Sequence, residues 1–148
     1  MKVTAMFNFN QVPRALCALL AATSVAHAHG TPAAAKATDP VVTALMSKAM
    51  SNLPGKEVLM ITVDYPPGGA DPVHRHDAHG FIYVLEGSIV MGVKGGKEQT
   101  LMPGQTFYEG PKDLHTVGRN ASATEPAKFL VFLVKEKSKP AVILVKQP

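Results

Sequence analysis

From Glu57 to the end of the chain, short apolar runs rich in β-branched and aromatic residues alternate with turns of glycine and proline. Runs of this length and composition are typical of β-strands, and many short strands at regular spacing favour a β-sandwich or barrel. A barrel of this kind can hold one small ligand in its mouth. The predicted strands cover residues 58–65, 73–77, 81–85, 88–93, 98–101, 106–109, 115–118, 128–134 and 141–146.

A single short helix is predicted ahead of these strands. Asp39 and Pro40 have the pattern of an N-cap followed by proline at the first helical position. Apolar residues follow at near-helical spacing, and a Pro-Gly pair ends the segment. The sequence therefore predicts one amphipathic helix over about 40–52, packed on the outside of an all-β domain.

The first 28 residues have the order of a secretory signal peptide. Lys2 and Arg14 supply positive charge, and residues 15–25 form an apolar stretch too short to span a membrane. Residues 26–28 have the Ala-x-Ala form of a cleavage site. The alternative is a buried N-terminal helix. The signal-peptide interpretation predicts cleavage after Ala28 and a periplasmic or secreted bacterial protein.

Cleavage would change the charge and the cysteine content of the chain. Without Lys2 and Arg14 the 15 basic residues become 13, against 11 acidic ones, so the formal net charge falls from +4 to +2. This near-neutral balance gives no support for binding to nucleic acid or to a membrane, and we expect neither. The one cysteine, Cys17, would also be removed, which leaves no disulfide and no thiol nucleophile.

Three histidines have the spacing of a metal site. His74 and His76 are two residues apart in a predicted strand, so their side chains face the same side. His115 lies in a later predicted strand. Three neutral imidazoles from two strands suit one divalent transition metal, with iron, copper, zinc and nickel as the candidates.

The pattern around these histidines resembles the cupin superfamily, whose members are small barrels of the double-stranded β-helix, or jelly-roll, type. The resemblance covers roughly residues 57–135. Together with the signal peptide predicted over 1–28 and the lead-in and short helix predicted over 29–56, it places a cupin barrel over 57–148. The matching residues are Gly68, His74, His76 and Gly87 in the first cupin signature, and Gly104 and His115 in the second.

The chain departs from the first signature at its glutamate. That residue would fall at position 80, or at 81 with the longer spacing, and the chain has Gly80 and Phe81 there. Three interpretations stay open: the three histidines hold the metal alone, His79 replaces the glutamate, or the metal site is lost and the barrel only binds a ligand. Strict alternation points His79 away from the other histidines, so the second interpretation requires a bulge.

Other side chains are candidates for lining the pocket. Tyr83 lies within an apolar predicted strand, and alternation turns one of Phe107 and Tyr108 toward the interior. The resemblance implies a small-molecule ligand or substrate, with dioxygenase-like or Lewis-acid chemistry if the protein is an enzyme. It also leaves room for a binding module without chemistry, and for a homodimer paired through the apolar segment 129–134.

Overall fold

The computed structural model describes residues 39–145, so the predicted signal peptide and most of the lead-in lie outside the described residues. None of the described residues belongs to a helix that is long and apolar enough to cross a membrane. Within this range the chain forms ten strands: β1 (Val41–Ala49), β2 (Lys56–Tyr65), β3 (His74–Arg75), β4 (Ala78–Glu86), β5 (Ile89–Val93), β6 (Gln99–Leu101), β7 (Thr106–Glu109), β8 (Leu114–Asn120), β9 (Ala127–Glu136) and β10 (Ile143–Leu144).

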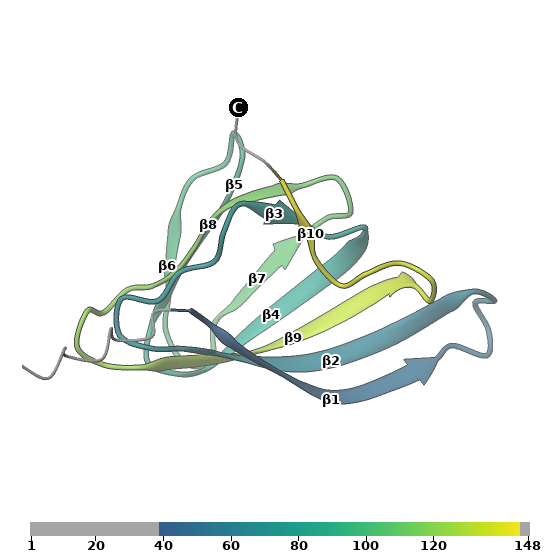
Figure 1. Cartoon of the computed structure of the whole chain (residues 1–148), viewed down its shortest axis with the longest axis horizontal. Helices are drawn as coiled ribbons and strands as arrows, with labels where there is room; N and C mark the ends of the chain where they lie inside the picture. Colours follow the sequence, from purple (N-terminus) through teal and green to yellow (C-terminus); the bar gives the residue numbers. More distant parts are fainter. Residues whose placement is uncertain (1–38, 146–148) are drawn as a thin grey trace, which may run out of the picture. The chain divides into compact units, whose positions relative to one another are not determined.

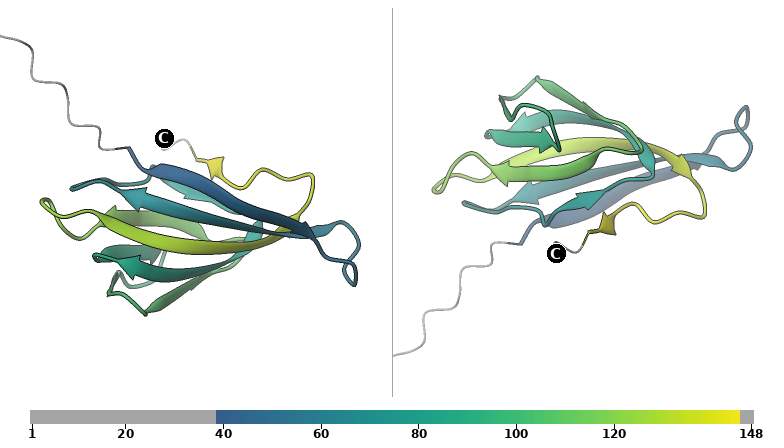
Figure 2. Two further views of the ribbon diagram at one scale, coloured as in Figure 1. Left: turned by 90° about the horizontal axis from the view of Figure 1, so that it is seen from below. Right: turned by 90° about the horizontal axis from the view of Figure 1, so that it is seen from above.

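The strands form two five-stranded antiparallel sheets that face each other (Figure 1). Sheet A has the order β1-β2-β9-β4-β7, and sheet B has the order β10-β3-β8-β5-β6. The two views of Figure 2 look onto sheet A and onto sheet B in turn. Strands that are neighbours in a sheet are mostly distant in sequence, which is the connectivity of a jelly roll. The predicted all-β jelly-roll class is confirmed.

The helix predicted over 40–52 is wrong, because residues 41–49 form β1 at the edge of sheet A. The segment begins Val-Val-Thr, and residues branched at Cβ favour extended backbone. A bulge between Ala44 and Met46 inserts one residue, so Val42 and Met46 lie on opposite faces of the strand and not on one apolar stripe. The barrel therefore begins at β1, ahead of the boundary that the sequence suggested.

Strict alternation along β4 and β9 builds the core between the sheets. Every second residue of both strands is buried over most of their length, as expected where one face packs on a core and the other faces outward. Each large apolar side chain buried in this way contributes about 1.5–3 kcal/mol to stability. The largest fully buried side chains are Tyr65, Ile89, Met91, Leu133 and Val84.

The buried side chain of Asn120 ties two loops to the end of β8. Its Nδ2 donates to the carbonyl oxygens of Pro66 at 3.0 Å and Glu125 at 2.8 Å, and its Oδ1 accepts from the Ser122 amide at 2.9 Å. The backbone amide of Asn120 also donates to the carbonyl of Gly69. These bonds hold the segment after β2 across sheet B, and that segment leads directly into the histidines of β3.

Candidate metal centre

Sheet B brings three buried histidines together. His74 on β3 is the direct cross-strand partner of His115 on β8, and His76 follows β3 by one residue. One ring nitrogen from each histidine can be chosen so that all three lie within 4.8 Å of one another. The structure thus brings together the three histidines that the sequence selected.

Hydrogen bonds fix how two of these rings present their nitrogens. His74 Nδ1 donates to the carbonyl of Pro72 at 2.8 Å, and His76 Nδ1 donates to the carbonyl of Ala141. In each neutral ring the proton is then on Nδ1, and Nε2 carries a lone pair. The two Nε2 atoms are 3.2 Å apart. Two lone pairs facing each other at this distance need a proton or a metal ion between them, and two neutral imidazoles arranged in this way are suited to a metal ion.

His115 completes the group of nitrogens. Its Nδ1 lies 3.3 Å from His74 Nε2, and its Nε2 is buried without a hydrogen-bond partner among residues 39–145. Burial lowers the pKa of His115; Glu109 opposes this effect, and a protonated His74 would reinforce it. A neutral imidazole with Nδ1 aimed at the other histidines is the form that binds a metal.

A buried carboxylate lies against the same histidines, and the sequence interpretation missed it. Glu109 at the end of β7 has Oε1 3.3 Å from His76 Nε2 and Oε2 3.5 Å from His115 Nδ1. Burial by itself raises the pKa of Glu109, but the histidines, when they are protonated, outweigh it and lower the pKa, first through the hydrogen bond from His76 and then through their positive charge. Burial lowers the pKa of His76, but the hydrogen bond and the negative charge of Glu109 have the larger combined effect, so the pKa is raised.

A second carboxylate stands beside the histidines on the cavity wall. Asp71 accepts a hydrogen bond from the buried hydroxyl of Tyr65. A Cβ placed at Gly118 would lie 3.0 Å from Asp71 Oδ2 and 3.1 Å from His115 Cε1, so all these groups crowd around that glycine. Burial and the negative charge of Asp71 raise the pKa of Tyr65 far above its usual range. Tyr65 therefore remains a hydrogen-bond donor that holds Asp71 in place.

The polar groups occupy part of an otherwise apolar cavity of about 460 Å³ between the sheets. Its polar lining consists of Asp71, Glu109 and the three histidines. Pro40 and Val42, at the start of β1, lie on its wall together with Ala141 and Val142, which precede β10. Val42 is 60% exposed, so the cavity opens to solvent beside this edge strand. The apolar lining residues are Val42, Ala44, Leu59, Ile61, Val63, Ile82, Met91, Phe129, Val131 and Val142.

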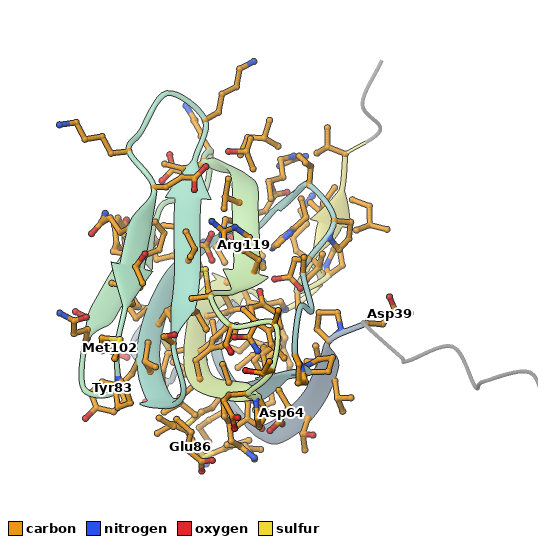
Figure 3. All side chains as sticks on the ribbon, turned by 90° about the vertical axis from the view of Figure 1, so that its left-hand side faces the viewer. Asp39, Asp64, Tyr83, Glu86, Met102 and Arg119 are labelled. Atoms are coloured by element: carbon orange, nitrogen blue, oxygen red, sulfur yellow. The ribbon has the colours of Figure 1, made fainter. Side chains whose placement is uncertain are left out.

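Three of the residues predicted for the site lie elsewhere. His79 and Tyr83 are on the outer face of β4, both exposed, and Figure 3 shows Tyr83 pointing away from the inside of the barrel. The hydroxyl of Tyr108 lies 2.7 Å from His79 Nδ1, also on the outside. Alternation along β4 continues without a bulge at His79, so His79 does not join the other histidines. Phe107 is buried and its ring stacks on His115, with 6.5 Å between centroids.

Fold and site together define a small jelly-roll barrel with a histidine cluster inside it. The family model described as a cupin domain matches residues 61–133. With the cupin folds of the structural neighbours, this match shows that the chain belongs to the cupin superfamily. Comparison with the curated proteins gives no match.

Several solved structures are similar to this chain. An uncharacterized conserved protein with a double-stranded β-helix domain from Klebsiella pneumoniae has a TM-score of 0.60 at 15% identity, over 76% of this chain and 90% of that one. The DMSP lyase DddQ from Ruegeria pomeroyi has a TM-score of 0.52 at 23% identity, over 59% and 42%. A recombinant oxalate oxidase in complex with glycolate has a TM-score of 0.54 at 25% identity, over 74% and 56%. The chain thus spans less than half the length of the lyase.

Proposed function

We propose that this protein is a metal-dependent cupin that binds a small organic molecule in its barrel. The observation that carries the proposal is the pair of Nε2 lone pairs of His74 and His76, which face each other 3.2 Å apart beside His115. A divalent transition metal at this point would satisfy all three nitrogens. Iron, copper, zinc and nickel suit the imidazole donors.

The composition of the cavity indicates the class of ligand. The polar groups are confined to the histidine cluster, Glu109 and Asp71, and the rest of the wall is aliphatic or aromatic. A volume of about 460 Å³ lies within the usual range for small-molecule sites. We therefore propose a ligand with one oxygen or sulfur donor group, such as a carboxylate or thiolate, on an apolar body.

The protein would act on this ligand as an enzyme if the metal has positions left for it. A bound metal would supply Lewis-acid or oxygen chemistry there. The chain itself supplies Asp71, held by Tyr65 on the cavity wall, as a group able to accept a proton from a bound molecule. The structural neighbours include a lyase and an oxidase, which supports a reaction on a small molecule without choosing one.

The alternative is binding without chemistry. It is favoured by the mainly apolar wall, where Asp71 is the one titratable lining side chain outside the group formed by Glu109 and the histidines. The two functions differ in one measurable way. A binding protein would be stabilised by a ligand that it returns unchanged, whereas an enzyme would convert it.

The test begins with elemental analysis of the untagged protein, purified without a chelator. We expect close to one equivalent of a transition metal, and a fall in the melting temperature when a chelator removes it. Apolar carboxylates and thiols are then screened by thermal shift, and each one that binds is incubated aerobically and anaerobically with product analysis. A protein that holds no metal, even after reconstitution, would refute the proposal.

We also propose that the protein is exported from the cell. The order of charge, apolar stretch and Ala-x-Ala in the first 28 residues supports this proposal. Expression of the full chain in a bacterium, followed by fractionation and N-terminal sequencing, tests it. A periplasmic protein that begins at His29 is the expected result, and an unprocessed cytoplasmic protein would contradict it.

A homodimer is the proposed assembly. The outer face of sheet A exposes large apolar side chains on neighbouring strands, including Phe81 and Tyr83 on β4 and Tyr108 on β7. Phe132 on β9 is the cross-strand partner of Phe81 and extends the same face. Contiguous apolar surface of this kind marks an interaction site, and a second copy of the chain presents the matching face.

A further inference from the structure

The glutamate that the first cupin signature places in β4 is absent, and Glu109 stands beside the vacated position. Gly80 of β4 and Glu109 of β7 are direct cross-strand partners. Both face the interior of the barrel and are buried. A Cβ built at Gly80 would lie 2.8 Å from Cγ and 3.0 Å from Oε1 of Glu109. The side chain of Glu109 therefore occupies the space that a side chain at position 80 would need.

The donor atoms of Glu109 and the histidines form a closed ring. Starting from His74 Nε2, the ring runs to His76 Nε2 at 3.2 Å and then to Glu109 Oε1 at 3.3 Å. From Oε2 of the same carboxylate it continues to His115 Nδ1 at 3.5 Å and back to His74 Nε2 at 3.3 Å. Ligands held about 2.0–2.2 Å from one metal lie about 3.3–3.5 Å apart at tetrahedral angles. Each neighbouring pair of side chains in this ring thus has the spacing of two ligands of one metal.

We infer that Glu109 is the fourth metal ligand of this cupin, supplied by the strand next to the usual one and made possible by Gly80. The inference rests on the proposed metal site. It changes the expected chemistry, because one carboxylate lowers the charge of a divalent metal with its ligands from +2 to +1. An oxygen donor also makes the site more suitable for iron or manganese than three imidazoles alone.

The contacts of Glu109 indicate a metal ligand and not a base that stands beside a three-histidine site. Among the described residues, the carboxylate of Glu109 forms no ion pair with lysine or arginine, and its two oxygens contact His76 and His115. A buried carboxylate needs a charged or hydrogen-bonding partner to offset its desolvation. The metal is a partner that satisfies Glu109 and the facing lone pairs of the histidines at the same time.

The experiment measures metal affinity by competition with a chelator for the full protein and four variants. Glu109→Gln keeps the shape and removes the charge, and we expect at least about a 100-fold loss of affinity. Gly80→Ala keeps the carboxylate but displaces it, and we expect a smaller loss. The exchange variant Gly80→Glu/Glu109→Gly returns the carboxylate to β4, and we expect it to recover most of the affinity. Glu86→Gln is the matched control, the same substitution at an exposed carboxylate of β4 outside the cavity, whose affinity should stay within a few-fold of the unaltered protein.

A spectroscopic measurement makes the assignment independent of activity. Substitution with Co(II) reports the number and type of ligands through its visible absorption, and Glu109→Gln is expected to change that spectrum while Glu86→Gln leaves it unchanged. Equal affinity and an unchanged spectrum in Glu109→Gln would overturn this inference alone. No metal binding by the unaltered protein would overturn the proposed function as well. If Glu109→Gln fails to fold, the exchange variant still tests the inference. A folded exchange variant that binds no metal would count against it.

Discussion

The inner and outer faces of β4 carry contrasting side chains. On the inner face, Gly80 makes room for the buried carboxylate of Glu109 beside the histidine cluster. On the outer face of the same strand, His79, Phe81 and Tyr83 are exposed. Polar groups are thus concentrated inside the barrel, in an apolar cavity, while aromatic groups face outward. A barrel that needed only to fold would have the reverse distribution, so both faces indicate function.

The contrast between the two faces is clearest for two histidines, His76 and His79, which are only three residues apart. His76 is buried, donates to the carbonyl of Ala141 and faces a carboxylate. His79 is exposed and contacts the hydroxyl of Tyr108, with the two rings stacked 6.1 Å apart. The residue type is the same, and the face of the strand decides what it can do.

The largest expected effect is a loss of metal affinity when a buried histidine is removed, compared with no loss when the exposed His79 is removed. His115→Ala should lower metal affinity by more than about 100-fold, because it removes a ligand and leaves Glu109 without one of its contacts. His79→Ala should leave metal content unchanged. Both variants are compared by elemental analysis after the same exposure to a chelator. Metal loss from His79→Ala equal to that from His115→Ala would break the distinction between the faces.

The sequence was informative about the site where a local pattern carries the information. The His-x-His spacing and the position of His115 predicted three side chains that the structure brings together. Alternation from position 80 also pointed His79 outward, as the structure has it. These inferences needed only the two-residue period of a strand and the similarity of the signatures.

Glu109 could not be found in the same way, because its relation to Gly80 depends on the register between β4 and β7. The available signal was weaker: residues 107 and 109 of one strand share a face, so an inward Phe107 implies an inward Glu109. β1 was missed for a different reason. Its apolar residues have near-helical spacing in the sequence, and only pairing with β2 identifies it as a strand.

The second prediction concerns the outer face. Phe81→Lys puts a charge into the centre of the proposed dimer contact, where a central aromatic residue typically contributes about 2 kcal/mol or more to binding. The dissociation constant of the dimer should rise about 30-fold or more, with metal content unchanged. Sedimentation over a range of concentrations measures this. Leu144→Lys, at an exposed apolar position on sheet B, is the control and should dimerise normally.

A monomer in the unaltered protein at micromolar concentration would refute the dimer, and the outer face of β4 would then need another explanation. A dimer that survives Phe81→Lys would move the interface to another part of the surface, and the edge strand β1, which exposes four large apolar side chains (Val41, Val42, Leu45 and Met46), would be the next candidate. Either result would show whether the outward aromatic residues of sheet A contact a second copy of the chain.

The third prediction compares two lysines on opposite faces of β9. Lys135 is buried on the inner face and donates to Glu57 at 2.6 Å and to the carbonyl of Glu136 at 2.9 Å. Lys128 pairs with Asp64 at 3.0 Å on the outside, where an exposed pair contributes less than about 1 kcal/mol. Lys135→Ala should therefore lower the free energy of unfolding several times more than Lys128→Ala does.

Urea denaturation of both lysine variants at pH 7 measures this difference. The two substitutions remove the same number of atoms from the same strand, so burial and pairing account for any difference between them. Losses of similar size would mean that Lys135 is as well solvated as Lys128, contrary to its 4% exposure.

The smallest expected effect is a dependence on pH at the same end of the barrel. Glu57 is partly exposed and accepts hydrogen bonds from Lys135 and from the Ser47 hydroxyl at 2.9 Å. These bonds lower the pKa of Glu57 below its ordinary value of 4.5, against a smaller opposing effect of burial. A carboxylate whose pKa is lowered by folding stabilises the protein above its ordinary pKa, and loses that contribution as the pH falls through the lowered value.

Glu57→Gln should accordingly be less stable than the unaltered protein at pH 7, and the gap should close as the pH falls below about 4.5. Ser47→Ala removes one of the two donors and should give a smaller gap that closes over the same range. Urea denaturation at intervals between pH 3 and pH 7 measures both gaps. A gap that stays constant over this range would mean that Glu57 gains nothing from its charge, and the buried Lys135 would then be held by the carbonyl of Glu136 alone.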